Sequence, residues 1–195
     1  MSAPSPDAGV RQGRWPAQVL EIAALRGAGS ALAQCAHRLG EALPGPGEVR
    51  ASAPRVSLCV RPQRWLLLQP AEGPEAAARA HAWQEGCGGL AAAIDMSSAL
   101  SVLLLSGRPA REMLARGCRL DLHPQVFRPG MAASTLLAQV PVTLAALPGG
   151  LLLLSPSSTA QHLGEWLEAT ARPFGEPGTL DIEALFSGET ATRYP

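Results

Sequence analysis

Residues 107–124 read GRPAREMLARGCRLDLHP, and residues 133–142, which follow a connection containing Pro and Gly, read ASTLLAQVPV. Pro109 suits the first turn of a helix and Gly117 suits the position after one, so a short helix is predicted between them. The second segment alternates apolar and polar side chains, which is the period of a half-buried strand. Pro141 interrupts that strand and predicts a bulge, an edge or a break. The expected order is strand end, helix, polar loop and strand.

Hydrophobic periodicity on both sides of this stretch predicts alternating strands and helices. The predicted strands are 19–25, 56–60, 65–69, 90–96, 101–106, 134–147 and 151–155, the last one entered by a turn at Gly149-Gly150. The predicted helices are 30–43, 74–86, 109–117 and one that begins with a capping box at Ser158 and Gln161 and ends before Pro173. This order is β-α-β-β-α-β and then β-α-β-β-α. It predicts an α+β fold of two interlocked ferredoxin-like halves, with antiparallel sheets and helices packed on one face.

The distribution of Pro and Gly suggests how the chain is divided. Residues 1–16 are polar and rich in both, and are predicted to be a mobile tail. Residues 17–175 are predicted to form one α+β domain. Residues 176–195 are predicted to be an extended tail with one helical turn near 182–186.

Composition excludes several classes of function. The chain has 195 residues, of which 47% are hydrophobic and 16% charged, with 16 Lys+Arg against 16 Asp+Glu. A nucleic-acid-binding protein would normally carry a basic excess, so that class is not expected. The chain contains no lysine, which removes Schiff-base chemistry and the lysine of a phosphate-binding loop. Zero net charge favours association with other chains, as expected for a subunit.

Cysteine and histidine are too dispersed to predict a metal site. The four cysteines are about 24 to 31 residues apart in sequence, outside the spacings of zinc sites and dithiol redox motifs. No secretory signal precedes them and no apolar run is long enough to cross a bilayer, so a cytoplasmic protein that contacts no membrane is expected. No nucleophile elbow or phosphate-binding glycine motif is found. The chain is therefore predicted to hold no catalytic, cofactor or metal site.

Two groups of residues are candidates for contact with a partner. The polar loop after the short helix is dense in ionisable side chains, and it is either a salt-bridged anchor or a docking surface. Trp15 lies where the predicted tail meets the fold, and Trp65 begins a strand as a core residue or an interface rim. The candidate interface residues are Trp15, Trp65, Arg116, Asp121, His123 and Arg128.

The opening stretch resembles the hallmark of the gamma subunit family of heterotetrameric sarcosine oxidase, GP-A-R-x-x-L-A-K-G-C-x-L-D-L followed by T-x-L-A-x-V-P-V. Arg116 stands in place of the usual lysine of this family. RPQRWLLL at 61–68 is similar to its G-P-x-x-W-L-L strand pair, with Arg for Gly, and Asp95-Met96-Ser97-Ser98 resembles its Asp-x-Ser-x strand end. The closing helix keeps the Trp-Leu of Trp166-Leu167 but little of the Arg-Ser-Phe before it. The resemblance covers about 55–175.

The resemblance implies a four-chain bacterial enzyme that oxidises sarcosine to glycine, passes the one-carbon unit to tetrahydrofolate and forms hydrogen peroxide. In that family the alpha subunit holds NAD and folate, the beta subunit holds FAD and shares a covalent FMN, and the delta subunit holds zinc. The gamma subunit holds none of these. Its fold is related to the folate-binding domain of aminomethyltransferase, the T-protein.

Two other functions remain open at this stage. A stand-alone folate-binding one-carbon protein of the T-protein kind would use Asp95 against the pterin. A thiol-dependent enzyme would use Cys118, although a cysteine that closes a short helix is usually buried and inert. Which N-methyl amino acid a complex would oxidise is not set by this chain.

Overall fold

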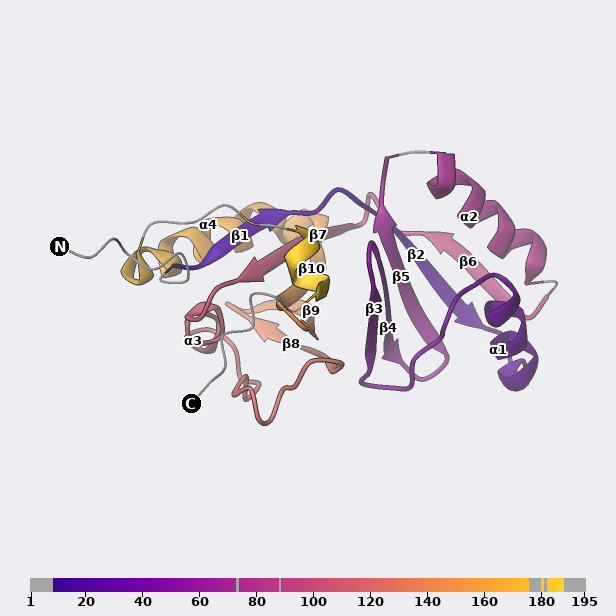
Figure 1. The fold of residues 1–195 in the computed structure, drawn as a ribbon, viewed down its shortest axis with the longest axis horizontal. Helices are drawn as coiled ribbons and strands as arrows, with labels where there is room; N and C mark the ends of the chain where they lie inside the picture. Colours follow the sequence, from indigo (N-terminus) through magenta and orange to yellow (C-terminus); the bar gives the residue numbers. More distant parts are fainter. Residues whose placement is uncertain (1–8, 73, 88, 176–179, 181, 188–195) are drawn as a thin grey trace.

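Two five-stranded sheets make up the centre of the molecule (Figure 1). The computed structural model describes residues 9–72, 74–87, 89–175, 180 and 182–187. The first sheet has the order β1 (Arg11–Arg14), β7 (Leu100–Ser106), β10 (Gly150–Pro156), β9 (Val140–Leu147), β8 (Ala132–Leu137). The second has the order β3 (Val49–Ser52), β4 (Arg55–Arg61), β5 (Arg64–Pro70), β2 (Ala17–Ala24), β6 (Ala91–Asp95). All neighbouring strands within these sheets are antiparallel.

The helices are α1 (Gly29–Arg38), α2 (Pro74–Gly86), α3 (Ala110–Ala115), α4 (Ala160–Ala171) and α5 (Ile182–Ser187). In the half of the chain that forms the second sheet, β2 lies between β5 and β6. In the half that forms the first sheet, β7 lies between β10 and β1 in the same way, but β1 comes from the N-terminal end of the chain. The predicted α+β fold with interlocked ferredoxin-like halves is therefore confirmed, and β1 is the element that interlocks them.

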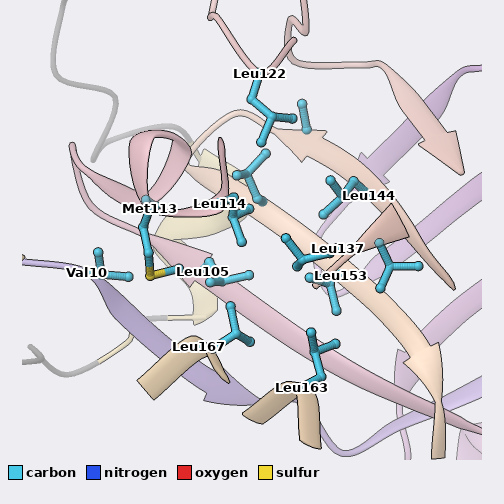
Figure 2. Close-up of a cluster of buried hydrophobic side chains, with 14 of the residues drawn as sticks. Val10, Leu105, Met113, Leu114, Leu122, Leu137, Leu144, Leu153, Leu163 and Leu167 are labelled. Carbon is cyan, nitrogen blue, oxygen red and sulfur yellow. The ribbon is translucent and has the colours of Figure 1, made fainter. Parts of the chain in front are cut away.

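Three apolar clusters separate the layers. Leu66 and Leu68 of β5 pack between the two sheets with Leu104 of β7 and Leu152 of β10. The opposite face of β5 carries Leu67, which packs with residues of α1 and α2. The third cluster covers the outer face of the first sheet, where side chains of α3 and α4 meet the strands (Figure 2). Each sheet is thus buried on both faces, which explains the continuous apolar runs in its strands.

The single strand predicted over 134–147 is two strands. β8 and β9 form a hairpin whose two turn residues, Ala138 and Gln139, have φ of 50° and 66°. Two successive positive φ values define the type I′ turn, which usually carries Asn-Gly or Asp-Gly. Ala and Gln do not signal such a turn, and the apolar alternation continues across it, so the sequence pattern did not reveal the hairpin.

Pro141 lies inside a strand that has neighbours on both sides. Leu137 and Val140 close the two-residue turn and form a hydrogen-bonded pair, so the nitrogen of Pro141 points away from β8. β9 pairs with β10 only from Thr143 onward. The missing N–H of Pro141 therefore costs no sheet hydrogen bond, and the strand continues without a break.

The prediction of a mobile tail over 1–16 is wrong for its last residues. Residues Arg11–Arg14 form β1 and pair with β7, from Arg11 opposite Ser106 to Arg14 opposite Leu103. The neighbouring Val10 is 1% exposed. Residues 1–8 lie outside the described residues. The β3 strand was also not predicted, because its segment lies among Pro, Gly and Ser residues.

At the other end of the chain, the helical turn predicted near 182–186 is confirmed as α5. Leu185 is fully buried and belongs to the cluster between the sheets, so this segment is part of the core rather than an extended tail. The backbone N–H of Gly149 donates to the carbonyl of Leu185 over 3.0 Å. A Cβ at Gly149 would lie 2.3 Å from the Ala184 oxygen, so glycine is required where α5 crosses the β9–β10 turn. The rest of 176–195 lies outside the described residues.

Candidate interaction surface

One arginine ties the middle of the polar connection from α3 to β8, here called the α3–β8 loop (residues 116–131), to α3. Nη1 of Arg111 on α3 donates to the carbonyl oxygens of Leu122 (2.9 Å) and Phe127 (2.8 Å). The side chains of Leu122 and Phe127 enter the outer core cluster and are 3% and 2% exposed. Arg111 and two apolar anchors therefore give this loop a defined shape, and the polar residues between the anchors are turned outward.

Asp121 and His123 lie together on the outer side of the loop, and both are exposed. Oδ1 of Asp121 accepts a hydrogen bond from the backbone N–H of His123 over 2.8 Å, and Nδ1 of His123 accepts one from the backbone N–H of Gln125 over 3.3 Å. These bonds form consecutive turns in which the side chains fix the backbone. The two predicted residues thus have a structural function as well as an exposed surface.

A broad open hollow of about 750 Å³ lies between the loop and α3, here called the α3 hollow. Asp121 and His123 line one wall, and Arg108, Arg111 and Glu112 line the other. The charges on the two walls therefore include both signs. The second wall was missed at the level of sequence, although its residues belong to the opening motif, because only folding brings α3 beside the loop.

The other two charged candidates do not reach the α3 hollow. The guanidinium of exposed Arg116 lies 4.4 Å from the ring centroid of Phe174, a cation–π contact that places it near the end of α4. Arg128 is exposed at the far end of the loop, where its backbone N–H meets Sδ of Met131 at 3.4 Å. Val126 and Met131 beside it are exposed apolar residues, at 50% and 37%. The four charged candidates thus follow the length of the loop.

Of the two tryptophan candidates, Trp15 is buried and Trp65 is half-buried. Trp15 is 5% exposed, and its ring meets Phe186 of α5 edge to face, with centroids 6.1 Å apart. The expectation that Trp15 forms a partner contact is corrected by this burial, which follows from the pairing of β1 and the docking of α5. Trp65 is half-buried on the second sheet, and its Nε1 donates to the carbonyl of Pro44 over 2.8 Å. It packs beside the cluster under α1 and α2.

The residues considered for other chemistry have structural partners. Oδ1 of Asp95 accepts from the backbone N–H of Ser97 (2.8 Å) and from its hydroxyl (2.5 Å), and that hydroxyl also accepts from the N–H of Val19. Cys118 is half-buried, with Sγ 3.9 Å from Oγ1 of Thr135. Asp95 and Cys118 thus anchor turns and strand ends.

Burial raises the pKa values of two thiols. It raises the pKa of Cys87 to about 11, and the nearby Cys35 adds to the rise. Burial also raises the pKa of Cys59. Within the described residues no group of three or more His, Cys, Asp or Glu side chains could hold a metal ion, and no helix there is long and apolar enough to cross a membrane.

Comparison with known proteins identifies the family. The model of the "Sarcosine oxidase, gamma subunit family" matches residues 26–169, which include strands β3 to β10 and the α3–β8 loop. The chain belongs to the sarcosine oxidase gamma subunit family. Sarcosine oxidase subunit gamma from Corynebacterium sp. (strain P-1) is 34% identical over 149 residues, which are 75% of this chain and 71% of that protein. The Arthrobacter sp. subunit is 39% identical over 114 residues, 57% of this chain and 55% of that one.

Solved structures agree with the assignment of this chain to the gamma subunit family. A chain of heterotetrameric sarcosine oxidase from Corynebacterium sp. U-96, determined with pyrrole 2-carboxylate, superposes with a TM-score of 0.77 at 27% identity, and 89% of each chain is covered. Aminomethyltransferase T of the glycine cleavage system from Bartonella henselae superposes with a TM-score of 0.67 at 15% identity. That match covers 92% of this chain and 51% of the other. The fold relation to the T-protein that the sequence implied is therefore confirmed.

Proposed function

We propose that this chain is the gamma subunit of a heterotetrameric sarcosine oxidase that works in the cytoplasm. The observation that carries the proposal is the superposition on a chain of the Corynebacterium sp. U-96 heterotetramer over 89% of both chains, at 27% identity, together with the family match. In this proposal the partners are the alpha, beta and delta subunits. The complex oxidises sarcosine to glycine, transfers the one-carbon unit to tetrahydrofolate and releases hydrogen peroxide.

In the same proposal the gamma subunit is structural and non-catalytic, and FAD, FMN, NAD, tetrahydrofolate and zinc are held by the partner chains. Support comes from the positions of its ionisable side chains. Arg111 binds two carbonyl groups, Asp121 fixes a turn, and Asp95 is bound to Ser97. The raised pKa of Cys87 keeps this thiol protonated at neutral pH, whereas a nucleophilic cysteine needs the thiolate.

The α3–β8 loop is the part of the surface that we assign to partner contact. It presents Asp121, His123 and Arg128 to solvent beside the exposed apolar Val126 and Met131. Such a mixture of apolar and charged groups on a loop of defined shape is typical of protein interfaces. Arg116, fixed over Phe174, extends this surface toward α4. We leave Trp15 and Trp65 out of this proposed surface, because Trp15 is buried against α5 and Trp65 lies on the other sheet.

Charge substitutions test the assignment of the surface. His123→Asp together with Arg128→Glu alters two exposed side chains, and we expect association with the partner chains to weaken by at least about tenfold. Glu168→Arg, at an exposed position on α4, is the matched control and should leave association unchanged. Equal association of both variants, measured by co-purification at matched expression, would remove the loop from the interface.

The non-catalytic role is tested on the purified full chain. We expect no flavin absorbance and no sarcosine-dependent oxygen consumption. Micromolar binding of tetrahydrofolate by the isolated chain would contradict the proposal and support a stand-alone folate-binding protein, whose fold the aminomethyltransferase shares. Sarcosine consumption by the chain alone would contradict it from the other side.

A further inference from the structure

Among the described residues, the two sheets end in four edge strands, which are β1, β8, β3 and β6. An unpaired edge can bind a strand of another chain, so proteins usually protect it with charged side chains or cover its backbone. β1 carries Arg11 and Arg14. At β3 the backbone N–H of Val49 already donates to the carbonyl of Gly130 over 2.9 Å. Both edges therefore have one of the usual forms of protection.

The edge strand β8 is held at both of its ends. The backbone N–H of Ala132 donates to the carbonyl of Gly47 over 2.8 Å. At the other end, Leu137 forms a bridge with Cys118 of the α3–β8 loop. Another strand can therefore approach only the short middle part of this edge.

The edge strand β6 lacks these protections (Figure 1). It reads Ala-Ala-Ala-Ile-Asp, without a proline or a basic side chain. Ile94 is 45% exposed, and Ala92 on the same face is exposed as well. The one charged side chain, Asp95, lies at the end of the strand, where its Oδ1 accepts from the N–H and the hydroxyl of Ser97. β6 is thus the least protected edge in the part of the chain that the structure describes.

The backbone of β6 shows what this edge can bind. Just before the strand, the N–H of Leu25 donates to the carbonyl of Leu90 over 2.9 Å. Because hydrogen-bonded pairs alternate along an antiparallel ladder, Ala92 and Ile94 also bond to β2. The same alternation turns the N–H and C=O groups of the remaining residues away from β2, and these are Ala91, Ala93 and Asp95. No described residue pairs with this outer side of the strand.

We propose that β6 binds an extended segment of a partner subunit, which adds a sixth strand to the second sheet. The proposal rests on the proposed function, because the partner belongs to that complex. The outward groups recur about every 7 Å, at about 3.4 Å per residue, which is the repeat of a pairing strand. Backbone hydrogen bonds hold the segment, an apolar side chain of it packs on Ile94, and a basic side chain fits opposite Asp95.

The size of this edge favours a partner subunit over a second copy of the chain. The 5 residues of β6 span about 17 Å, and a sheet layer is about 10 Å thick. Pairing through β6 alone therefore buries roughly 200 Å² on each side, whereas a stable interface buries about 800 Å² on each side. Two copies joined only by β6 would not stay associated. A partner subunit that also contacts the α3–β8 loop gains the missing area, and each contact strengthens the other.

Hydrogen exchange at single-residue resolution tests the pairing directly. In the isolated chain, the outward N–H of Ala93 should exchange fast, and the N–H of Ile94, which bonds to β2, should exchange slowly. In the complex purified with its partner subunits, exchange at Ala93 should slow at least about tenfold, because its N–H gains an acceptor. Ile94 is the internal control, since its N–H has an acceptor in both states.

Two variants weaken the edge without removing a hydrogen bond inside the sheet. Ala93→Pro removes one outward N–H, a change that edge strands tolerate, and Ile94→Lys introduces the side chain with which natural edges avoid pairing. Each should raise the apparent Kd for the partner chains about tenfold, the loss expected for one or two backbone hydrogen bonds. Ala51→Pro is the matched control, because it removes an outward N–H from the protected edge β3 and should leave association unchanged.

The possible failures are distinguishable. If the unmodified chain co-purifies with partner subunits but Ala93 exchanges as fast as in the isolated chain, the β6 proposal is wrong and the proposed function stands. A dimer of the isolated chain that Ala93→Pro dissociates would also overturn it, because a second copy would then occupy the edge. An unmodified chain that retains no partner would contradict the proposed function and this proposal with it. If Ala93→Pro does not fold, Ile94→Lys decides alone, because its backbone groups are unchanged.

Discussion

Replacement of Arg111 by methionine should loosen the α3–β8 loop and destabilise the chain. The substitution keeps an apolar stem of similar length and removes the guanidinium that binds the carbonyl groups of Leu122 and Phe127 at 2.9 and 2.8 Å. A hydrogen bond from a charged donor contributes about 1.5–3 kcal/mol, and both acceptors belong to buried residues. The loss of two such bonds should therefore lower the free energy of unfolding by about 3 kcal/mol or more.

Urea unfolding at neutral pH measures this change, and hydrogen exchange locates it. A loss of about 3 kcal/mol is a large part of the 5–15 kcal/mol that stabilises a typical domain, so the urea midpoint should fall clearly. Faster amide exchange should be confined to residues 116–131. Arg128→Met makes the same chemical change at an exposed position and should cost less than about 0.5 kcal/mol. Equal costs for the two variants would refute the anchoring function of Arg111.

Three further substitutions or conditions probe the packing. A Cβ at Gly117 would lie 2.5 Å from Cζ2 of Trp166, so Gly117→Ala should cost about 1–3 kcal/mol of unfolding free energy in urea. Leu185→Ala empties a fully buried position between the sheets and should cost about 2–5 kcal/mol, whereas a value near zero would mean that α5 does not dock. The pKa of Cys87 is raised from 9.0 to about 11, so the folded state favours the protonated thiol. Its stabilising contribution is complete below pH 9 and is lost as the pH rises to 11, by roughly 3 kcal/mol at 1.36 kcal/mol per pKa unit. Cys87→Ala should lack this part of the alkaline loss, measured as the difference in unfolding free energy across that interval.

The elements predicted well were those whose signals are local. Pro109 and Gly117 bounded α3 closely, and the apolar stripe of α4 places Leu163 and Leu167 in the core. The Trp-Leu-Leu-Leu run of β5 predicted a strand. The run is continuously apolar because both faces of its sheet are covered. The α+β order followed from these signals. The predicted capping box at Ser158 was wrong: α4 begins at Ala160 after a 3₁₀ turn, without a side-chain cap, and Gln161 binds Glu165 instead.

The elements that were missed depend on contacts distant in sequence. β1 is four residues long and polar, and it becomes a strand only because β7 offers it an edge. The β8–β9 hairpin turns at Ala138-Gln139, two residues whose types do not suggest positive φ. The helical turn at α5 was predicted, but its docking into the core through Leu185 was not. In each case tertiary packing outweighed a weak local preference.

The interaction surface could be predicted only in part for the same reason. The density of ionisable residues singled out the α3–β8 loop, and the structure does bring Asp121 and His123 to one wall of the α3 hollow. The function of Arg111 depends on where two backbone carbonyls lie, which residue types do not reveal.

The measurement that tests the central claim most directly is the subunit composition of the complex purified through an affinity tag on this chain. The account predicts that the alpha, beta and delta subunits of a sarcosine oxidase co-purify with it in equal amounts, that native mass spectrometry finds one copy of each, and that all flavin remains with the partner chains. A chain that purifies alone from cells expressing all four, or a sarcosine-oxidising complex that assembles without it, would contradict the account.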